Sequence, residues 1–157
     1  MGRAVRAKRN NGILIAGCGR LGSGLASMLS ARGHSVTVID RDGRAFRRLP
    51  AEFAGFELQG DATDPDILRD AGVETAGLLV AATENDNVNC MIAQIAGRLF
   101  GLGQVFARFD DPELSYLVEG SGIHVLCPAQ LSMDAFSAVS LLSADEAGTP
   151  RRGGIFT

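Results

Sequence analysis

The segment Gly17-Cys18-Gly19-Arg20-Leu21-Gly22 places three glycines at the spacing of a dinucleotide-binding turn. An apolar run at residues 13–16 precedes this turn, and apolar residues recur at helical spacing after it. In such a context Gly17 permits the sharp turn, Gly19 admits a phosphate close to the backbone, and Gly22 lets the helix pack on the strand. The unpaired N–H groups at the start of that helix favour an anion. The segment therefore predicts a phosphate site.

An acidic residue follows the next predicted strand. Residues 35–39 have the composition of a strand, and Asp40 comes directly after them, at about the expected offset of 20 residues from the glycines. A carboxylate at this place accepts hydrogen bonds from ribose hydroxyls and repels a 2′-phosphate. We therefore expect NAD(H) or an adenosine di- or triphosphate as the ligand, with NADP(H) disfavoured.

Other polar residues follow the remaining predicted strands, at the edge of the sheet where such folds bind ligands. The guanidinium of Arg20, within the glycine turn, is suited to a terminal phosphate. Asp61 is suited to accept a hydrogen bond from the adenine amino group or from a sugar hydroxyl, and the alternative is that it caps a helix. Three further residues are suited to bond a ribose or a phosphate, namely Thr83, Asn85 and Asn87. The alternative for these three is that they cap the next helix. The candidate binding residues at these strand ends are Gly17, Cys18, Gly19, Arg20, Leu21, Gly22, Asp40, Arg41, Asp61, Ala62, Thr83, Asn85 and Asn87.

The sequence offers little for catalysis at this edge. His34 and His124 precede or open predicted strands and therefore belong to the opposite edge, and the only lysine, Lys8, lies in the N-terminal arm. Cys18 lies at a helix N-terminus, which favours a thiolate, although a cysteine within such a turn is more often packed. We expect no catalytic residue. The alternative is a component of an NAD-dependent oxidoreductase that lacks its substrate domain.

Strand and helix patterns alternate along the whole chain. This alternation predicts an α/β fold of the Rossmann type, a doubly wound parallel sheet of six strands in the order 3-2-1-4-5-6, built as a single domain. The predicted strands cover residues 13–16, 35–39, 55–58, 76–82, 104–109 and 123–127. The predicted helices cover residues 20–32, 43–50, 65–71, 87–100, 112–119 and 129–143, with Thr63 or Asp64 as the cap of the third.

The chain has 157 residues, of which 46% are hydrophobic and 21% charged, as is ordinary for a globular domain. We expect a flexible basic arm over residues 1–11, the nucleotide-binding domain over 12–143 and a flexible tail over 144–157. A net charge of −3 gives no reason to expect nucleic-acid binding. Three scattered cysteines favour a reducing, cytoplasmic setting, and no apolar stretch is long enough to span a membrane.

Six motifs in order resemble the N-terminal domain of Trk/Ktr potassium-uptake regulators, the RCK, KTN or TrkA-N domain. The resemblance covers residues 12–136, nearly the whole predicted domain. The motifs are Gly17-Cys-Gly-Arg-Leu-Gly22, Val38-Ile-Asp40, Gly60-Asp61-Ala62-Thr63, the stretch from Ala81 to Asn87, Ala107-Arg108-Phe-Asp-Asp-Pro-Glu113 and Gly122-Ile-His-Val-Leu-Cys-Pro128.

The resemblance implies a nucleotide-sensing regulatory subunit on the inner face of the membrane. Such subunits bind ATP, ADP, AMP or NAD(H), form homodimers or rings and act on a membrane-embedded potassium transporter or channel. It implies that Asp61 and Ala62 lie by the adenine, that Arg108 lies near the phosphates or a dimer contact, and that Glu119 is a weak candidate for a cation site. Many members carry a second domain, so the resemblance also implies either a truncated chain or a companion polypeptide.

Overall fold

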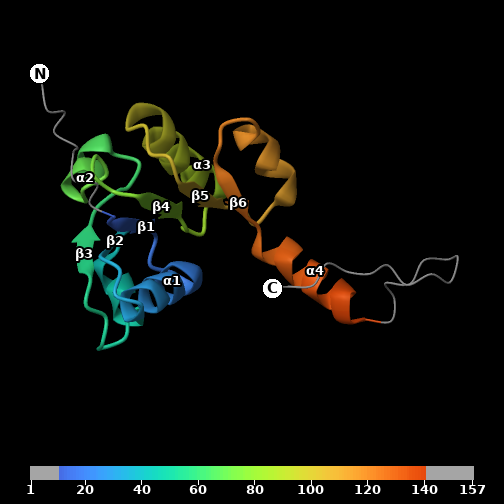
Figure 1. Ribbon diagram of the computed structural model, residues 1–157, viewed down its shortest axis with the longest axis horizontal. Coiled ribbons are helices and arrows are strands. Elements are labelled where there is room, and N and C mark those ends of the chain that lie inside the picture. The colour runs from blue at the N-terminus through green and yellow to red at the C-terminus, as the bar shows by residue number, and fades with distance from the viewer. Residues whose placement is uncertain (1–10, 141–157) are drawn as a thin grey trace, which may run out of the picture.

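The computed structural model describes residues 11–140, in which six parallel strands form one sheet (Figure 1). Their order is β3-β2-β1-β4-β5-β6, as predicted for a Rossmann-type sheet. Chain order reverses between β1 and β4, so the carboxyl end of β1 is the switch point at which such sheets bind ligands. The strands are β1 (Ile13–Ala16), β2 (Val36–Asp40), β3 (Phe56–Gln59), β4 (Leu78–Ala81), β5 (Val105–Arg108) and β6 (His124–Leu126).

The connections between the strands are helical. The α-helices are α1 (Arg20–Ala31), α2 (Pro65–Asp70), α3 (Asp86–Gln94) and α4 (Pro128–Val139), the 3-10 helices are η1 (Gly43–Arg48) and η3 (Pro112–Val118), and η2 (Ile95–Leu99) is a π-helical turn. The helix predicted over residues 87–100 is therefore not uniform, because it widens at Ile95, whose carbonyl accepts a hydrogen bond from the N–H of Phe100. The predicted helices at 43–50 and 112–119 wind as 3-10 helices.

Short polar side chains fix where four of these helices begin. Asp42, Asp64, Asn85 and Asp111 each accept a hydrogen bond from a backbone N–H two or three residues further on. Such caps satisfy donors that have no partner within the helix. Of the two caps expected for α2, Asp64 and not Thr63 is the one at the N-cap position.

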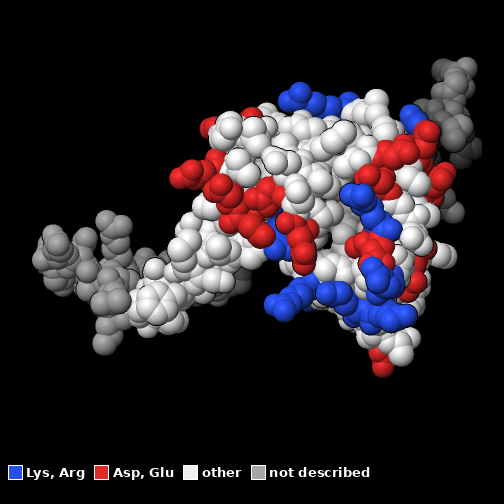
Figure 2. All heavy atoms as spheres, turned by 180° about the vertical axis from the view of Figure 1, so that it is seen from behind, with Lys and Arg blue, Asp and Glu red and all other residues white. Residues whose placement is uncertain are grey.

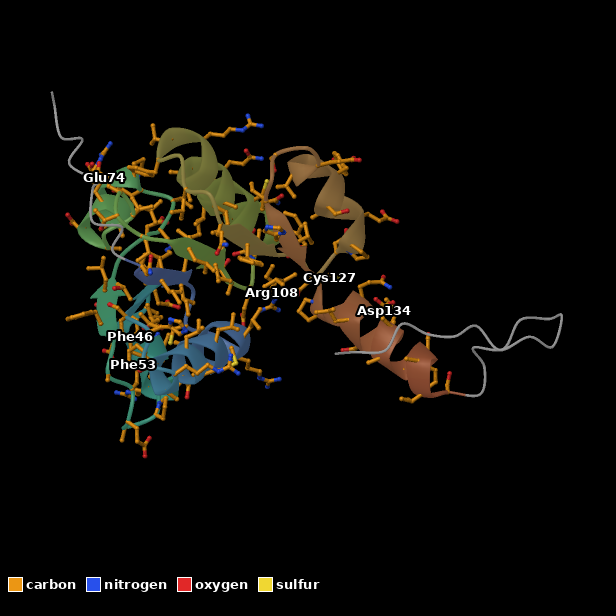
Figure 3. All side chains as sticks on the ribbon, in the orientation of Figure 1. Phe46, Phe53, Glu74, Arg108, Cys127 and Asp134 are labelled. Carbon is orange, nitrogen blue, oxygen red and sulfur yellow. The ribbon has the colours of Figure 1, made fainter. Side chains whose placement is uncertain are left out.

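Each face of the sheet has its own hydrophobic cluster. In β1, Ile13 and Ile15 pack toward α1 and η1, whereas Leu14 and Ala16 pack toward α2 and α3. Phe46 and Phe53 lie together beneath the first of these faces (Figure 3). Because β1 is covered on both faces, its side chains are apolar without alternation, as is typical of a central parallel strand.

Helix α4 differs from the other helices because it projects from the end of β6 away from the sheet (Figure 1). None of its twelve residues is buried. It begins at Pro128 and ends at Val139, so it is shorter than the helix predicted over 129–143. Residues 141–143, the arm predicted over residues 1–11 apart from Asn11, and the predicted tail at 144–157 lie outside the described residues.

Within residues 11–140, no helix is both long and apolar enough to cross a membrane.

Candidate functional site

A cavity of about 440 Å³ lies at the carboxyl ends of β1, β2, β3 and β4. Its volume is within the range of small-molecule sites. Nine of the predicted binding residues line it, namely Gly17, Cys18, Gly19, Asp40, Arg41, Asp61, Ala62, Thr83 and Asn85. The fold therefore brings together residues from four separate loops at the switch point of the sheet.

The glycine loop has the backbone geometry that its spacing predicts. Gly17 has a φ of +99°, a left-handed conformation that favours glycine, and a Cβ there would lie 2.8 Å from the backbone nitrogen of Thr83. A Cβ on Gly22 would overlap the carbonyl oxygen of Gly17, so only glycine lets α1 approach the loop this closely. At Gly19 a Cβ would meet nothing nearer than the Oε1 of Glu84 at 4.0 Å, which leaves this backbone open to a ligand.

Within the described residues, no side chain accepts a hydrogen bond from the free backbone N–H groups at the N-terminus of α1. Its N-cap residue, Gly19, has no side chain to act as a cap, and its first turn contains no acidic residue. The first N–H to be paired is that of Ser23, which donates to the carbonyl of Gly19. The earlier N–H groups and the positive end of the helix dipole are therefore available to an anion.

Asp40 connects this loop to β2. Its Oδ2 accepts a hydrogen bond of 2.7 Å from the backbone N–H of Cys18, and its Oδ1 accepts one of 2.9 Å from that of Asp42. These bonds hold the carboxylate at the cavity wall. Because an ionised carboxylate has about four acceptor positions, both oxygens retain capacity for ribose hydroxyls.

Cys18 is buried beside this carboxylate. Burial raises the pKa of the Cys18 thiol from its ordinary 9.0 to about 11, and the charge of Asp40 adds to the rise. The helix N-terminus therefore does not produce a thiolate here, and the packed alternative is the one that the structure supports.

Asp61 lines the cavity and stabilises the turn that precedes α2. Its Oδ1 accepts hydrogen bonds from the hydroxyl and the N–H of Thr63, and these bonds, with the charge of Arg41, lower the pKa of the carboxyl group. The Oδ2 makes no hydrogen bond within the described residues. Asp64, and not Asp61, caps α2, and the Oδ2 of Asp61 is available to a ligand in the cavity.

Asn89 is a structural residue that the sequence reasoning missed. It is fully buried in α3, where its Oδ1 accepts from the N–H and the hydroxyl of Thr83, and its Nδ2 donates to the carbonyls of Thr83 and Arg108. All four hydrogen-bonding positions of the amide are thus used. Thr83 is held by this contact and Asn85 caps α3, so both side chains already have structural partners.

Five predicted binding residues do not line the cavity. Leu21 and Gly22 lie within α1, Arg20 is exposed at its first residue, and Asn87 is exposed on α3. Arg108 pairs with Asp110 through two hydrogen bonds of 2.8 and 2.9 Å and lies near Cys127 at the end of the sheet (Figure 3).

Glu119, the weak cation candidate, is exposed at the end of η3, on a separate cavity that Tyr116 and His124 also line. Within residues 11–140, no three His, Cys, Asp or Glu side chains are grouped to hold a metal ion.

Eight further residues line the cavity. Ile39, Gly60, Ala82 and Glu84 lie within the motifs quoted from the sequence, whereas Ala45, Arg48, Val88 and Ile92 lie outside them. Arg48 belongs to η1, and basic side chains gather at the end of the molecule that carries α1 and η1 (Figure 2). The signal for Glu84 was its place three residues after the end of β4, in the stretch from Ala81 to Asn87 already expected to bind a ligand.

Known proteins share both the sequence pattern and the fold. The model of the family described as the TrkA-N domain matches residues 13–128. A Trk system potassium uptake protein TrkA from Streptomyces coelicolor is 42% identical over 122 residues, which are 78% of this chain and 55% of that protein. The chain spans about half or less of the length of the curated relatives it matches first.

Two solved structures extend the likeness to three dimensions. The Kef carboxyl-terminal domain of Shewanella denitrificans, described in its AMP-bound form, is 25% identical with a TM-score of 0.67, and the match covers 87% of this chain and 84% of that one. The GsuK channel described as bound to NAD is 19% identical with a TM-score of 0.68, over 85% of this chain and 24% of that one, and shows the fold alone.

Proposed function

The chain belongs to the TrkA-N domain family, and we propose that it is a nucleotide-sensing regulatory domain of a potassium-uptake system. Its ligand is NAD(H) or an adenosine mono-, di- or triphosphate, and NADP(H) is disfavoured. This agrees with the family match and with relatives whose structures are described with AMP and with NAD. The cavity at the switch point is the binding site.

One observation carries this proposal. The uncapped N-terminus of α1 and the carboxylate of Asp40 face the same cavity, and the N–H of Cys18, in the loop that leads into α1, donates a hydrogen bond of 2.7 Å to that carboxylate. The first feature suits a phosphate group and the second suits the hydroxyls of a ribose. A nucleotide contains both groups at adjacent positions, which is why this class of ligand fits best.

The role is regulatory and not enzymatic. Hydride transfer generally uses a histidine or lysine as acid or base near the reacting ring, and the described residues that line the cavity include neither. The charged groups in the cavity are carboxylates and guanidinium groups, which are suited to binding. An NAD-dependent oxidoreductase component remains the alternative, and NADH oxidation by the isolated chain would support it.

The partner is a membrane-embedded potassium transporter subunit, and the domain acts at the cytoplasmic face of the membrane as a homo-oligomer. The family and the named TrkA relatives support this assignment. The segments that match this chain make up 55% and 28% of two of these relatives.

Hydrogen bonds give a route from the cavity to the projecting helix. Thr83 at the cavity wall is bonded to Asn89, which also holds the carbonyl of Arg108 at the end of β5. The carboxylate of Asp86 accepts from the N–H groups of Asp110 and Asp111, where η3 begins. The thiol of Cys127, the residue before α4, donates to the carbonyl of Asp110 over 4.0 Å. A ligand that changes the position of Thr83 is therefore expected to alter the packing of α3 and the start of α4. Such couplings amount to about 1–3 kcal/mol.

The test is a calorimetric titration of the protein with ATP, ADP, AMP, NADH and NADPH. Asp40→Ala should weaken NADH, ATP, ADP and AMP by about tenfold, because it removes a charged acceptor from the ribose. It should also reduce the discrimination against NADPH. Arg20→Ala should weaken ATP and ADP more than AMP, because the guanidinium of Arg20 is proposed to meet a terminal phosphate.

Asp134→Asn is the matched control, because Asp134 lies on α4, away from the cavity (Figure 3). This variant should bind every ligand as the unaltered protein does. Equal binding of all nucleotides by the unaltered protein, Asp40→Ala and Arg20→Ala would contradict the proposal, as would the absence of any nucleotide binding.

A further inference from the structure

Two carboxylates stand on opposite sides of the glycine loop. Asp40 ends β2, Glu84 follows β4, and β1 lies hydrogen-bonded between these two strands. Both residues line the same cavity. The Oε1 of Glu84 is 4.0 Å from the position that a Cβ would take on Gly19, so Glu84 faces the part of the loop that is open to a phosphate.

Glu84 has no structural task within the part of the chain that the structure describes. It is exposed, and it forms no hydrogen bond or ion pair with any of residues 11–140, whereas its neighbours Thr83 and Asn85 both have such partners. An unpaired carboxylate beside an anion site opposes the binding of additional negative charge. A chain of three phosphates that crosses β1 would place its terminal phosphate near Glu84.

A dinucleotide presents a different group at this place. Its diphosphate crosses the switch point, and it has a ribose on each side, one toward β2 and one toward β4. The hydroxyls of the second ribose are hydrogen-bond donors, and a free carboxylate is an acceptor for them.

We propose that Glu84 binds the second ribose of a dinucleotide and thereby makes this site selective for NAD(H) over ATP. The inference rests on the proposed function, because it assigns the ligand of that same cavity. Asp40 and Glu84 then have parallel roles at the two ends of one diphosphate: each accepts hydrogen bonds from a ribose, and the amides of the glycine loop bind the phosphates between them.

The experiment measures the dissociation constants of NAD+, ATP and AMP for the intact chain by calorimetry, in the presence of EDTA. The unaltered protein should bind NAD+ about tenfold more tightly than ATP. Glu84→Gln removes the charge but keeps the shape and should tighten ATP about tenfold while weakening NAD+ about threefold. AMP should change less than twofold, because AMP occupies only the β2 side of the cavity.

Glu74→Gln is the matched control. Glu74 is exposed at the opposite edge of the sheet (Figure 3), and its substitution should leave all three constants unchanged. Because Glu84 is exposed, its variant should remain folded, which circular dichroism checks.

Three results separate the possibilities. If the NAD+ to ATP ratio is the same in Glu84→Gln as in the unaltered protein, the inference is wrong even though nucleotides bind. If Mg²⁺ makes ATP the tighter ligand and Glu84→Gln abolishes this effect, Glu84 holds a cation and the inference is again wrong. If not even AMP binds, the proposed function itself fails.

Discussion

Cys18 lies between two glycines of the phosphate loop, and its side chain is fully buried. Its position at a helix N-terminus favours the thiolate, while its burial favours the neutral thiol. Burial has the larger effect, and the carboxylate of Asp40, bonded to the N–H of Cys18, acts in the same direction. The loop therefore holds a protonated, unreactive thiol next to the site proposed for the phosphates.

A first prediction concerns the reactivity of this thiol. In a variant with Cys90 and Cys127 replaced by alanine, the alkylation rate of Cys18 at pH 8 should be about a hundredfold below that of a free cysteine. The rate should rise only as the pH approaches 11, the raised pKa. Measurement of iodoacetamide labelling against pH tests this expectation. Labelling of the folded protein at pH 8 at the rate of a free thiol would contradict it.

The same shift predicts an effect on stability. The folded-state pKa of Cys18 is raised above its ordinary value, so its contribution is fully present below pH 9 and is lost as the pH rises toward and beyond 11. The free energy of unfolding should therefore fall over this interval by up to about 2 kcal/mol more in the unaltered protein than in Cys18→Ala. Urea unfolding at several pH values measures this difference. An equal decrease in the free energy of unfolding in both proteins would show that the ionisation of Cys18 is not coupled to folding.

At the level of elements, Asn89 joins three segments. From α3 it bonds the backbone at the end of β4 and at the end of β5. Pairing between β4 and β5 ends at Ala81 and Ala107. Beyond this point the buried amide of Asn89 links Thr83, which follows β4, to Arg108, the last residue of β5, and so fixes the wall of the cavity.

Replacement of this amide should therefore destabilise the fold. Asn89→Leu has a similar volume but leaves the N–H of Thr83 and the carbonyl of Arg108 without partners, and we expect a loss of about 3 kcal/mol. Asn89→Asp should lose at least as much at neutral pH, because it places a negative charge against two carbonyl oxygens. Thermal or urea unfolding measures both variants.

Asn87→Leu is the control on the same helix. Asn87 is exposed, so its substitution should change stability by less than about 0.5 kcal/mol. Equal effects of the two leucine variants would show that the Asn89 contacts contribute little.

The order of the elements could be predicted from the sequence because it depends on local pattern. The glycine spacing, the apolar run of β1 and the position of Asp40 lie within one β-strand–helix–β-strand unit, and all have the predicted arrangement. The π-helical turn after Gln94 could not be predicted, because the apolar spacing of residues 87–100 also fits an ordinary α-helix.

Contacts between distant segments were harder to predict. Asn89 resembled a polar interruption on an apolar helix face, and only the folded structure brings Arg108 to it. Arg48 enters the cavity because η1 turns back toward β2, a path that residue spacing does not specify. Arg20 differs from Arg48, because it lies within the predicted glycine motif and yet does not line the cavity.

At the level of the whole molecule, charge and apolar surface are separated. Figure 2 shows basic side chains around the end that carries α1 and η1, one group of acidic side chains toward η3, and a second acidic group mixed with basic side chains on the side of α2. Helix α4 shows almost no charge, with Asp134 as its one charged residue, and it exposes Leu131, Met133, Phe136 and Val139.

An aromatic pair lies on a sheet face near the base of this helix. Phe106 and His124 stack with ring centroids 4.8 Å apart on the sheet face opposite to α3, where the described chain places no helix over β5 and β6. The helix α4 has no buried residue, and this sheet face has no helix over it within the described chain. A second copy of the chain would cover both.

We therefore expect α4 to hold the proposed homo-oligomer together. Phe136→Glu should convert a dimer to a monomer, because it places a charge in the centre of the apolar face that the second copy covers. Sedimentation velocity over a range of concentrations measures the change.

Phe56→Glu is the matched control. Phe56 lies on the edge strand β3, away from both surfaces, and its exposed fraction of 68% is close to the 61% of Phe136. A dimer that persists in Phe136→Glu would place the contact elsewhere. A monomer in the unaltered protein at every concentration would mean that a different polypeptide covers α4, because apolar side chains in this number are rarely left to water on a stable domain.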